Sequence, residues 1–84
     1  MEILDVIWDL DDEPDGNVQH IAEHDLSKDD VEDVLFGIHE FDTSHSTGRP
    51  IAFGFTSDGR YICVVFEWIE RETVYPVTAY CVDE

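Results

Sequence analysis

Two histidines four residues apart are the first feature of this sequence that could do chemistry. His20 and His24 have the spacing that puts two side chains on one face of a helix, and Glu23 lies beside them. Such a pair can hold zinc if further ligands come from His39, His45 or an acidic residue. No cluster of cysteines or histidines marks such a set, and the simpler interpretation is that His24 caps or packs at a helix end while His20 is exposed. We therefore predict no metal site and no cofactor.

The acidic segment 9–16 is a second candidate, because oxygen ligands crowded into a turn-rich loop can bind calcium. Its alternating carboxylates are Asp9, Asp11, Glu13 and Asp15. The segment lacks the glycine at the sixth position and the glutamate at the twelfth that an EF-hand loop requires. The chain also contains no phosphate-binding glycine loop and no Gly-x-Ser-x-Gly motif. Neither a calcium site nor a nucleophilic hydrolase is predicted.

The net charge is the most pronounced property of the composition. Aspartate and glutamate number 21 against 4 lysines and arginines, which gives a formal net charge of −17, and Lys28 is the single lysine. A surface of this kind repels phosphate backbones and favours basic partners. The alternative is salt adaptation, in which an acidic, lysine-poor surface serves solubility. At molar salt the screening length shrinks to roughly 3 Å, so the repulsion would weaken.

The length of 84 residues allows one domain with one core, and we take residues 1–84 as that domain. No stretch approaches the roughly 20 apolar residues of a membrane span. The start shows neither a basic n-region nor a cleavage-site pattern. Cys63 and Cys81 lie in apolar, strand-like runs, so we predict buried reduced thiols. These features predict a cytoplasmic protein with no membrane partner.

The amino-terminal half predicts a strand followed by two helices. Residues 3–8 form a short apolar strand, and the periodic apolar residues of 17–24 predict a short helix. A second helix over 27–35 begins at Ser27, whose hydroxyl can cap free backbone N–H groups, and Gly37 suits the helix end. We expect the two helices to form a hairpin.

The carboxy-terminal half predicts strands. Residues 38–41 form a candidate edge strand, residues 51–55 alternate large with small side chains, and residues 73–82 form a last strand. Asp58-Gly59 is a strong signal for a two-residue hairpin turn. The predicted fold class is therefore α+β, an antiparallel β-meander with a two-helix hairpin packed on one face.

A two-residue turn would decide which side chains share a face of the sheet. Phe55 would lie opposite Ile62 and Phe53 opposite Val64, so the members of both pairs are apolar and would join the core. Tyr75, Val77, Ala79 and Cys81 of the last strand would join them. The other face would show Tyr61, Cys63, Val65 and Glu67, with Val74, Pro76, Thr78 and Tyr80 from the last strand.

That second face predicts a binding surface. Tyr61, Val65, Pro76 and Tyr80 would form an exposed apolar patch, and Glu67 lies on the same face. Such a patch usually marks a contact with a protein partner or with a second copy of the chain. The alternative is that an edge segment or the chain terminus covers it.

Several short segments occur in a distinctive order between about Asp5 and Val82. They are Trp8-Asp9, His24-Asp25-Leu26-Ser27, Asp29-Asp30-Val31-Glu32, Arg49, Gly54, Gly59-Arg60 with the valine-rich strand after it, and Thr78-Ala79-Tyr80. In this order they resemble the BrnT-type toxins, which have a RelE-like ribonuclease fold. The resemblance implies a RelE/BrnT-like fold and an antitoxin-type protein partner.

The chain departs from that family at its cationic residues. Glu23 stands directly before the histidine, where the family usually has lysine, and Tyr75 and Tyr80 occupy a last strand that usually carries arginines. Cleavage of RNA in this way requires cations against the scissile phosphate, and losing one such group costs roughly 2.7–4 kcal/mol of transition-state stabilisation. The resemblance therefore implies a degenerate toxin that acts by protein binding, with RNA as a disfavoured partner.

The family's ribonuclease site, carried over to this chain, comprises His24 as acid or base, Arg49 and Arg60 as phosphate clamps, and Tyr80. The simpler interpretation of the two arginines is that each pairs with a carboxylate. Three functions remain open. They are a BrnT-like binding domain with a basic or antitoxin-like partner or a second copy, an active metal-independent ribonuclease toxin, and a small acidic domain with a salt-adapted surface.

Overall fold

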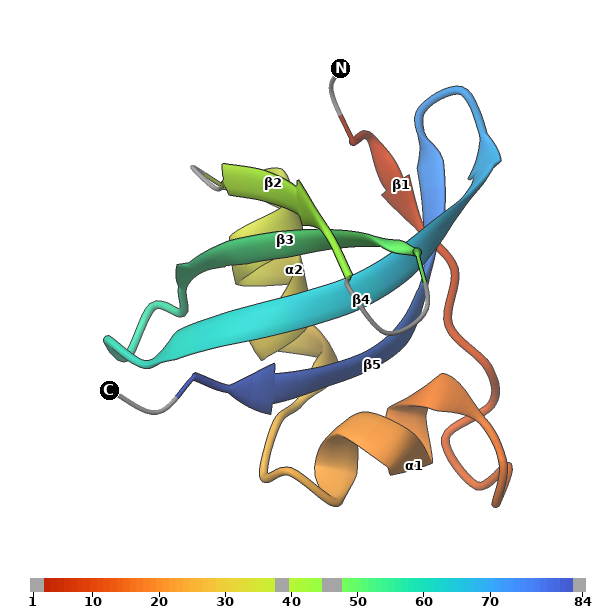
Figure 1. Ribbon diagram of the computed structural model, residues 1–84. Helices are drawn as coiled ribbons and strands as arrows, with labels where there is room; N and C mark the ends of the chain where they lie inside the picture. Colours follow the sequence, from red (N-terminus) through yellow and green to blue (C-terminus); the bar gives the residue numbers. More distant parts are fainter. Residues whose placement is uncertain (1–2, 38–39, 45–47, 83–84) are drawn as a thin grey trace.

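The computed structural model describes residues 3–37, 40–44 and 48–82 (Figure 1). Within these residues the elements are, in chain order, β1 (Asp5–Val6), α1 (Asn17–Ala22), α2 (Lys28–Phe36), β2 (Glu40–Thr43), β3 (Pro50–Phe55), β4 (Tyr61–Glu70) and β5 (Thr73–Cys81). The strands form one sheet in the order β1-β5-β4-β3-β2. The described residues thus form a small α+β domain, as predicted.

The strands β2 to β5 form the predicted antiparallel meander, but β1 does not follow it. β1 runs parallel to β5 at the edge of the sheet, so the sheet is mixed and the purely antiparallel prediction was wrong. Only Asp5 and Val6 pair with β5, and the chain leaves the edge after Ile7, whose N–H donates to the Val74 carbonyl at 2.9 Å. The strand is accordingly shorter than the expected 3–8.

The predicted edge strand over 38–41 corresponds to β2, which pairs with β3. Residues 38 and 39 of that prediction lie outside the described residues. His45 also lies outside the described residues. Two of the histidines considered as zinc ligands, His39 and His45, are therefore not placed.

The two helices contact different strands. α2 lies across β3 and β4, whereas α1 packs against β5 (Figure 1). α1 ends at Ala22, earlier than expected, and the connection passes through Asp25 with a φ of 61°. α2 begins with the expected cap, because the Ser27 hydroxyl accepts from the Asp30 N–H and the Asp30 carboxylate accepts from the Ser27 N–H. The predicted hairpin is thus two successive helices placed on different strands.

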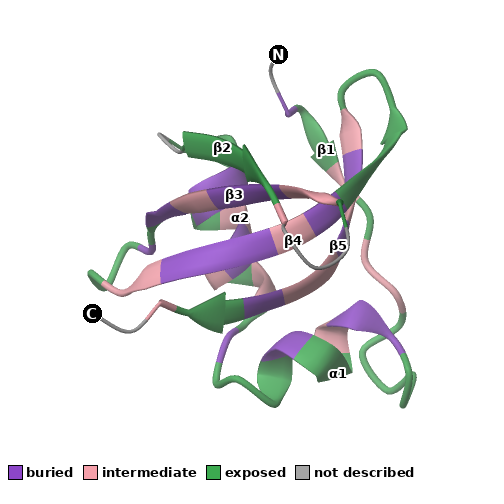
Figure 2. Ribbon diagram, in the orientation of Figure 1, coloured by how far each residue is buried: buried purple, intermediate pink, exposed green. Residues whose placement is uncertain are grey.

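The core lies between the sheet and the helices, on the side that α2 covers (Figure 2). Its buried residues are Ile3, Ile21, Leu26, Val31, Val34, Leu35, Ala52, Ile62, Val64, Phe66, Val74 and Ala79. Small residues stand where α2 contacts β3, since Ala52 and Gly54 are both buried there. We call this side of the sheet the helix-covered face and the opposite side the open face.

The turn between β3 and β4 has three residues instead of the predicted two. The Thr56 N–H donates to the Arg60 carbonyl at 2.8 Å, and the Gly59 N–H donates to the Thr56 carbonyl at 3.0 Å, which encloses residues 57–59. Gly59 has a φ of 91°, the left-handed geometry that closes a three-residue hairpin turn and that glycine adopts without strain.

This one-residue difference reverses the predicted faces of β3. Phe55 pairs with Tyr61 and Gly54 pairs with Ile62, so the predicted register was wrong by one residue. Neighbouring strand residues point to opposite faces, and a single-residue slip therefore exchanges the whole set. Phe53 and Phe55, which were predicted in the core, stand on the open face. The middle strand β4 keeps its predicted faces.

A bulge in β5 reverses part of that strand as well. Val65 pairs with Thr78 while Phe66 pairs with Pro76, which leaves Val77 as the extra residue of the bulge. Pro76 has no N–H to donate, so the position beside it is a natural place for the ladder to break.

The residues on either side of the bulge consequently face different ways. After it, Ala79 is buried in the core and Tyr80 stands on the open face, as predicted. Before it, Val74 and Pro76 are buried on the helix-covered face. The prediction that these two belong to the open face, and Tyr75 to the core, was wrong.

The two cysteines are both free thiols in different surroundings. Cys63 is buried and Cys81 is exposed at the end of β5, so the prediction of burial is confirmed for the first and wrong for the second. In the described ranges no helix has the length and apolar character needed to cross a membrane.

Candidate functional site

The open face is an apolar and largely aromatic surface on three neighbouring strands. Its residues are Ile51, Phe53 and Phe55 of β3, Tyr61, Cys63 and Val65 of β4, and Thr78 and Tyr80 of β5. Phe53 and Tyr61 stack with ring centroids 6.1 Å apart, and Phe55 lies 4.8 Å from Tyr61. Phe55 is 65% exposed and Tyr80 is 41% exposed, whereas Ile51 and Cys63 are buried. Aromatic groups in such positions offer a large contact area to a partner.

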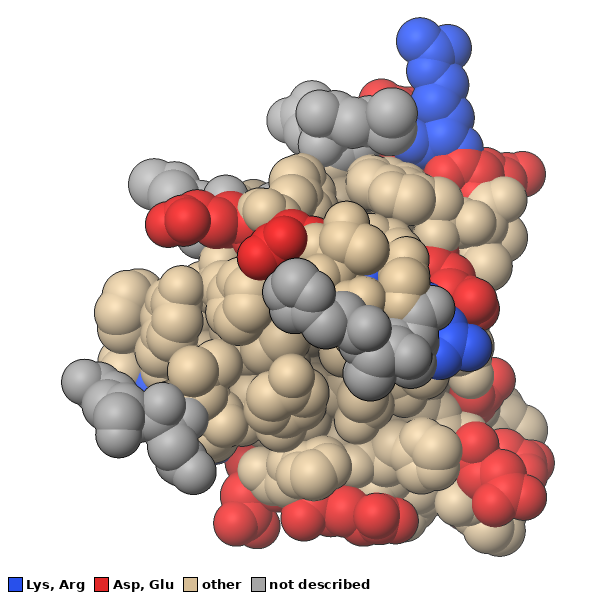
Figure 3. Space-filling model, viewed as in Figure 1, with Lys and Arg blue, Asp and Glu red and all other residues tan. Residues whose placement is uncertain are grey.

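Carboxylates border the open face along the strand β2. Glu40 and Asp42 of β2 are the cross-strand partners of Phe53 and Ile51, so they stand on the same face along one side. Glu23 directly follows α1, which packs against β5. Figure 3 shows acidic residues near β2 and near α1, and residues that are neither acidic nor basic over part of the surface between them.

Four of the five residues predicted for partner contact lie on the open side of the sheet. Tyr61, Val65 and Tyr80 belong to the open face, and Glu67 stands at its end. Pro76 does not, because the bulge turns it to the helix-covered face, where it is fully buried. The placement of Pro76 in the patch was therefore wrong.

His24 and Tyr80 are the two residues of the predicted catalytic set that lie together. Their ring centroids are 6.3 Å apart. The Tyr80 side chain is hydrogen-bonded to Cys63, and this bond together with burial raises the pKa of Tyr80 above its ordinary value of 10.0. Burial also raises the pKa of the Cys63 thiol. A phenol and a thiol that hold their protons this firmly are poor bases and nucleophiles near neutral pH.

Arg60 is engaged by acceptors from the helices and from its own turn. Its Nη1 donates to the Asp25 carbonyl at 3.0 Å, its Nη2 to the Asp30 carboxylate at 2.9 Å, and its Nε to the Asp58 carboxylate at 3.0 Å. Hydrogen bonds from Thr56 and Arg60 lower the pKa of Asp58. The guanidinium thus joins the β3–β4 turn to the start of α2. The predicted pairing of this arginine with carboxylates is confirmed.

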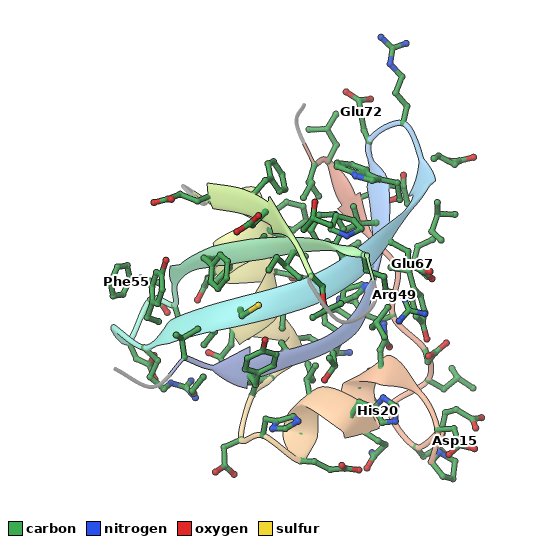
Figure 4. The ribbon with its side chains drawn as sticks, viewed as in Figure 1. Asp15, His20, Arg49, Phe55, Glu67 and Glu72 are labelled. Atoms are coloured by element: carbon green, nitrogen blue, oxygen red, sulfur yellow. The ribbon has the colours of Figure 1, made fainter. Side chains whose placement is uncertain are left out.

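Arg49 lies at the opposite end of the sheet. Its Nε donates to the Glu67 carboxylate at 3.2 Å, which confirms the predicted pairing for the second arginine. Figure 4 shows Arg49 beside Glu67, with Phe55 far from them at the other end. Arg60 directly precedes β4 at the Phe55 end, and the stretch of strand from there to Glu67 spans roughly 23 Å. The two guanidinium groups therefore do not converge on one phosphate.

The histidines do not assemble a metal site with the part of the chain that is described. There, no group of three or more His, Cys, Asp or Glu side chains gathers that could hold a metal ion. His20 belongs to α1 and is exposed (Figure 4), whereas the chain reaches His24 only after the helix has ended. The two imidazoles are thus not presented by one continuous helix, as their spacing had implied.

A polar cluster of Asp9, Asn17 and Tyr75 was not found by reasoning from the sequence. The Asp9 carboxylate accepts from the Tyr75 hydroxyl at 2.6 Å and from the Asn17 N–H at 2.9 Å. The buried Asn17 side chain accepts from the Asp9 N–H and donates to the carbonyls of Ile7 and Pro76. These bonds lower the pKa of Asp9, and the bond to Asp9 raises the pKa of Tyr75 to about 12.

This cluster has a structural role, because it joins the chain before α1 to β5. Part of this cluster has a signal in the sequence. An asparagine at the start of a helix, after a glycine, often forms side-chain hydrogen bonds with nearby backbone groups. Its distant partner on β5 has no such signal.

Comparison of the chain with models of known protein families, with curated proteins and with solved structures gave no match. The geometry itself therefore defines the candidate site. It is a partly exposed aromatic face with carboxylates of β2 beside it, and the predicted phosphate-binding arginines are engaged in ion pairs.

Proposed function

We propose that this protein is a BrnT-like domain of RelE-like fold that has lost ribonuclease activity and acts by binding a basic protein partner through its open face. The observation that carries the proposal is an apolar, aromatic face on which Phe55 and Tyr80 are exposed, with carboxylates of β2 beside it. Contiguous exposed apolar surface with a polar rim is typical of protein interaction sites.

The residues that resemble BrnT-type toxins have structural roles here, which supports a related architecture. The Trp8 indole N–H donates to Glu32 of α2 at 2.8 Å, and Asp9 is bonded to Tyr75 of β5. Arg60 joins the β3–β4 turn to α2. These motif residues hold the helices and the sheet together, so they would be retained in a member of the family that had lost its catalytic cations.

The charge supports a basic partner. With a net charge of −17, the chain attracts a cationic surface over distance and repels both RNA and a second copy of itself. Self-association is the alternative at high salt, where this repulsion is screened. Both cysteines are free thiols, which fits a reducing compartment, and we propose a cytoplasmic location.

An active ribonuclease is the second candidate, and one observation favours it. His24 and Tyr80 lie together on the open side, as a general acid or base and a neighbouring phenol would. Two observations argue against an active ribonuclease. Both arginines are ion-paired and lie far apart, and Glu23 places a carboxylate next to His24 in the sequence. A phosphodiester would meet mostly negative charge there.

The first test is a cleavage assay with purified protein and a structured messenger RNA fragment. We expect no cleavage above that of a variant carrying His24→Ala and Arg49→Ala, two exchanges at exposed or half-exposed side chains. Arg60 is unsuitable for this test, because its loss would disturb the fold. Cleavage that the double variant abolishes would establish the ribonuclease and overturn our proposal.

The second test is binding of two peptides that share their apolar residues and carry either lysines or glutamates. We expect only the lysine peptide to bind, and to bind more weakly as salt rises. Phe55→Asp should abolish binding. Phe36→Asp is the matched control, because Phe36 is also an exposed phenylalanine, on α2. Equal binding by both variants would rule out the open face.

A further inference from the structure

Acidic side chains are concentrated on the helix α2. Four of its nine residues carry carboxylates, and we call them the acidic row: Asp29, Asp30, Glu32 and Asp33. Residues three or four apart are neighbours on a helix surface, which makes three like-charged pairs within this row. They are Asp29 with Glu32, Asp29 with Asp33, and Asp30 with Asp33. Each such pair destabilises a helix, and the last turn of α2 has no basic residue to compensate. The charges of α2 therefore oppose its own stability.

Three carboxylates of the acidic row line one groove at the surface. The groove has a volume of about 540 Å³. It is lined by Asp29, Glu32, Asp33, Phe36, Gly37 and Ser57, none of which is basic. Asp29 and Asp33 are exposed, so mobile salt ions can reach the row from solvent. The repulsion between these carboxylates is thus open to screening by salt.

Two uncharged donors from other parts of the chain bind the acidic row. The Trp8 indole N–H donates to the Glu32 carboxylate at 2.8 Å. The Ser57 backbone N–H donates to the Asp33 carboxylate at 3.1 Å. Both contacts are short hydrogen bonds from neutral groups, so salt weakens them less than it weakens the repulsion between whole charges.

An ion pair with Arg60 also holds α2, and it is sheltered from salt. Arg60 Nη2 lies 2.9 Å from the Asp30 carboxylate, and the two side chains are only 34% and 16% exposed. Partly buried pairs are screened much less than exposed charges. Raising the salt concentration therefore removes more repulsion than attraction from α2.

We propose that α2 is a salt-controlled cover of the helix-covered face. At low ionic strength the acidic row favours release of α2 from β3 and β4, which it crosses (Figure 1). At high ionic strength the helix stays docked, with Val34 and Leu35 in the core. Neighbouring side chains of the row are roughly 5–6 Å apart. The screening length falls from roughly 30 Å at 0.01 M salt to 3 Å at 1 M, so it passes through this separation.

Amide hydrogen exchange of the full chain, followed by NMR in 0.01 M and 1 M sodium chloride, tests the release. Partial opening of a native fold gives the amides of the opening segment less protection than those that exchange only by global unfolding. At low salt we expect α2 to be less protected than the centre of β4. The three like-charged pairs correspond to about a three- to tenfold gain in α2 protection at 1 M salt. Equal protection of α2 and β4 at low salt would overturn the proposal.

Charge variants test whether the acidic row is the cause. Glu32→Gln with Asp33→Asn removes all three like-charged pairs and leaves side-chain oxygens that can accept the two hydrogen bonds. Asp12→Asn with Asp15→Asn is the matched control, because it removes the same charge from exposed positions in the loop before α1. The readout is the ratio of α2 protection at 1 M to that at 0.01 M salt, which a uniform loss of stability does not change. We expect the first variant to lose most of this gain and the control to keep it. Equal effects of the two variants would assign the gain to net charge and overturn the role of the row.

A second salt distinguishes screening from a bound ion. Screening depends on ionic strength and not on the size of the cation. Sodium chloride and tetramethylammonium chloride should therefore give the same gain in α2 protection at equal ionic strength. A gain with sodium alone would mean that a bound cation holds the acidic row, and it would overturn control by screening.

Discussion

The two faces of the sheet use similar residues for different purposes. On the helix-covered face, Phe66 and Ala52 are fully buried beneath the chain's own helices. On the open face, the alternate residues of β3 include Phe55, which is largely exposed. Both faces are apolar, and within the described residues α2 packs on only one of them. The core of the fold therefore lies on one face, and we propose that a partner binds the other.

The largest expected effect comes from removing one phenylalanine on each face. Phe66→Ala should lower the free energy of unfolding by about 3–5 kcal/mol, because it leaves a cavity in the core. Phe55→Ala should change it by no more than about 0.5 kcal/mol, as is usual for an exposed residue. Urea unfolding of both variants measures the difference. Similar losses would mean that the open face is part of the folding core.

A smaller contrast is expected between the two arginines. Arg60→Ala should destabilise the chain clearly, because Arg60 connects the β3–β4 turn to Asp25 and Asp30 on the helix side. Arg49→Ala should cost about 0–1 kcal/mol, since an exposed ion pair such as that with Glu67 contributes little and is screened by salt. Thermal unfolding at low and high salt tests this order. A greater loss for Arg49→Ala would contradict it.

The smallest expected effect is a change of folding stability with pH, which arises from the bond between Asp9 in the loop before α1 and Tyr75 of β5. The pKa of Asp9 is held below its ordinary 3.8 in the folded chain, so the stability from its bond to Tyr75 is present above that pH and is lost as pH falls through the lowered pKa. The pKa of Tyr75 is raised from 10.0 to about 12, so the same stability is present below pH 10.0 and is lost as pH rises towards 12.

Comparison with Tyr75→Phe isolates this contribution. The difference in unfolding midpoint between the parent and this variant should be constant near neutral pH and shrink at both extremes. Tyr61→Phe, which removes a hydroxyl from the open face, is the control and should show no such window. A difference that stays constant from acid to alkaline pH would exclude the Asp9 bond as its source.

Much of the fold could be predicted because it depends on local patterns. The cap at Ser27, the apolar stripe of α2 and the order of the meander strands all follow from neighbouring residues. The parallel pairing of β1 with β5 could not be predicted in this way. It joins Asp5 to Thr73, which are far apart in the sequence, and no local signal specifies such a contact.

Only part of the candidate site could be predicted, because the turn before β4 is one residue longer than expected. Tyr61 and Val65 were placed correctly, because β4 kept its predicted faces. Phe53 and Phe55 were missed because the turn before β4 has one residue more than Asp58-Gly59 alone indicates. Neighbouring residues of a strand point to opposite faces. An error of one residue in the length of the turn therefore places every side chain of β3 on the wrong face.

The turn over residues 57–59 thus has a consequence for how this chain can change in evolution. Deleting one residue from it would rotate β3 by half a turn and carry Phe53 and Phe55 to the side where Ala52 and Gly54 now lie beneath α2. Two phenyl rings do not fit into a space filled by a methyl group and a hydrogen atom, because protein interiors are close-packed. Most surface loops tolerate insertions and deletions, but here the length of an exposed loop is fixed by the volume available inside the protein.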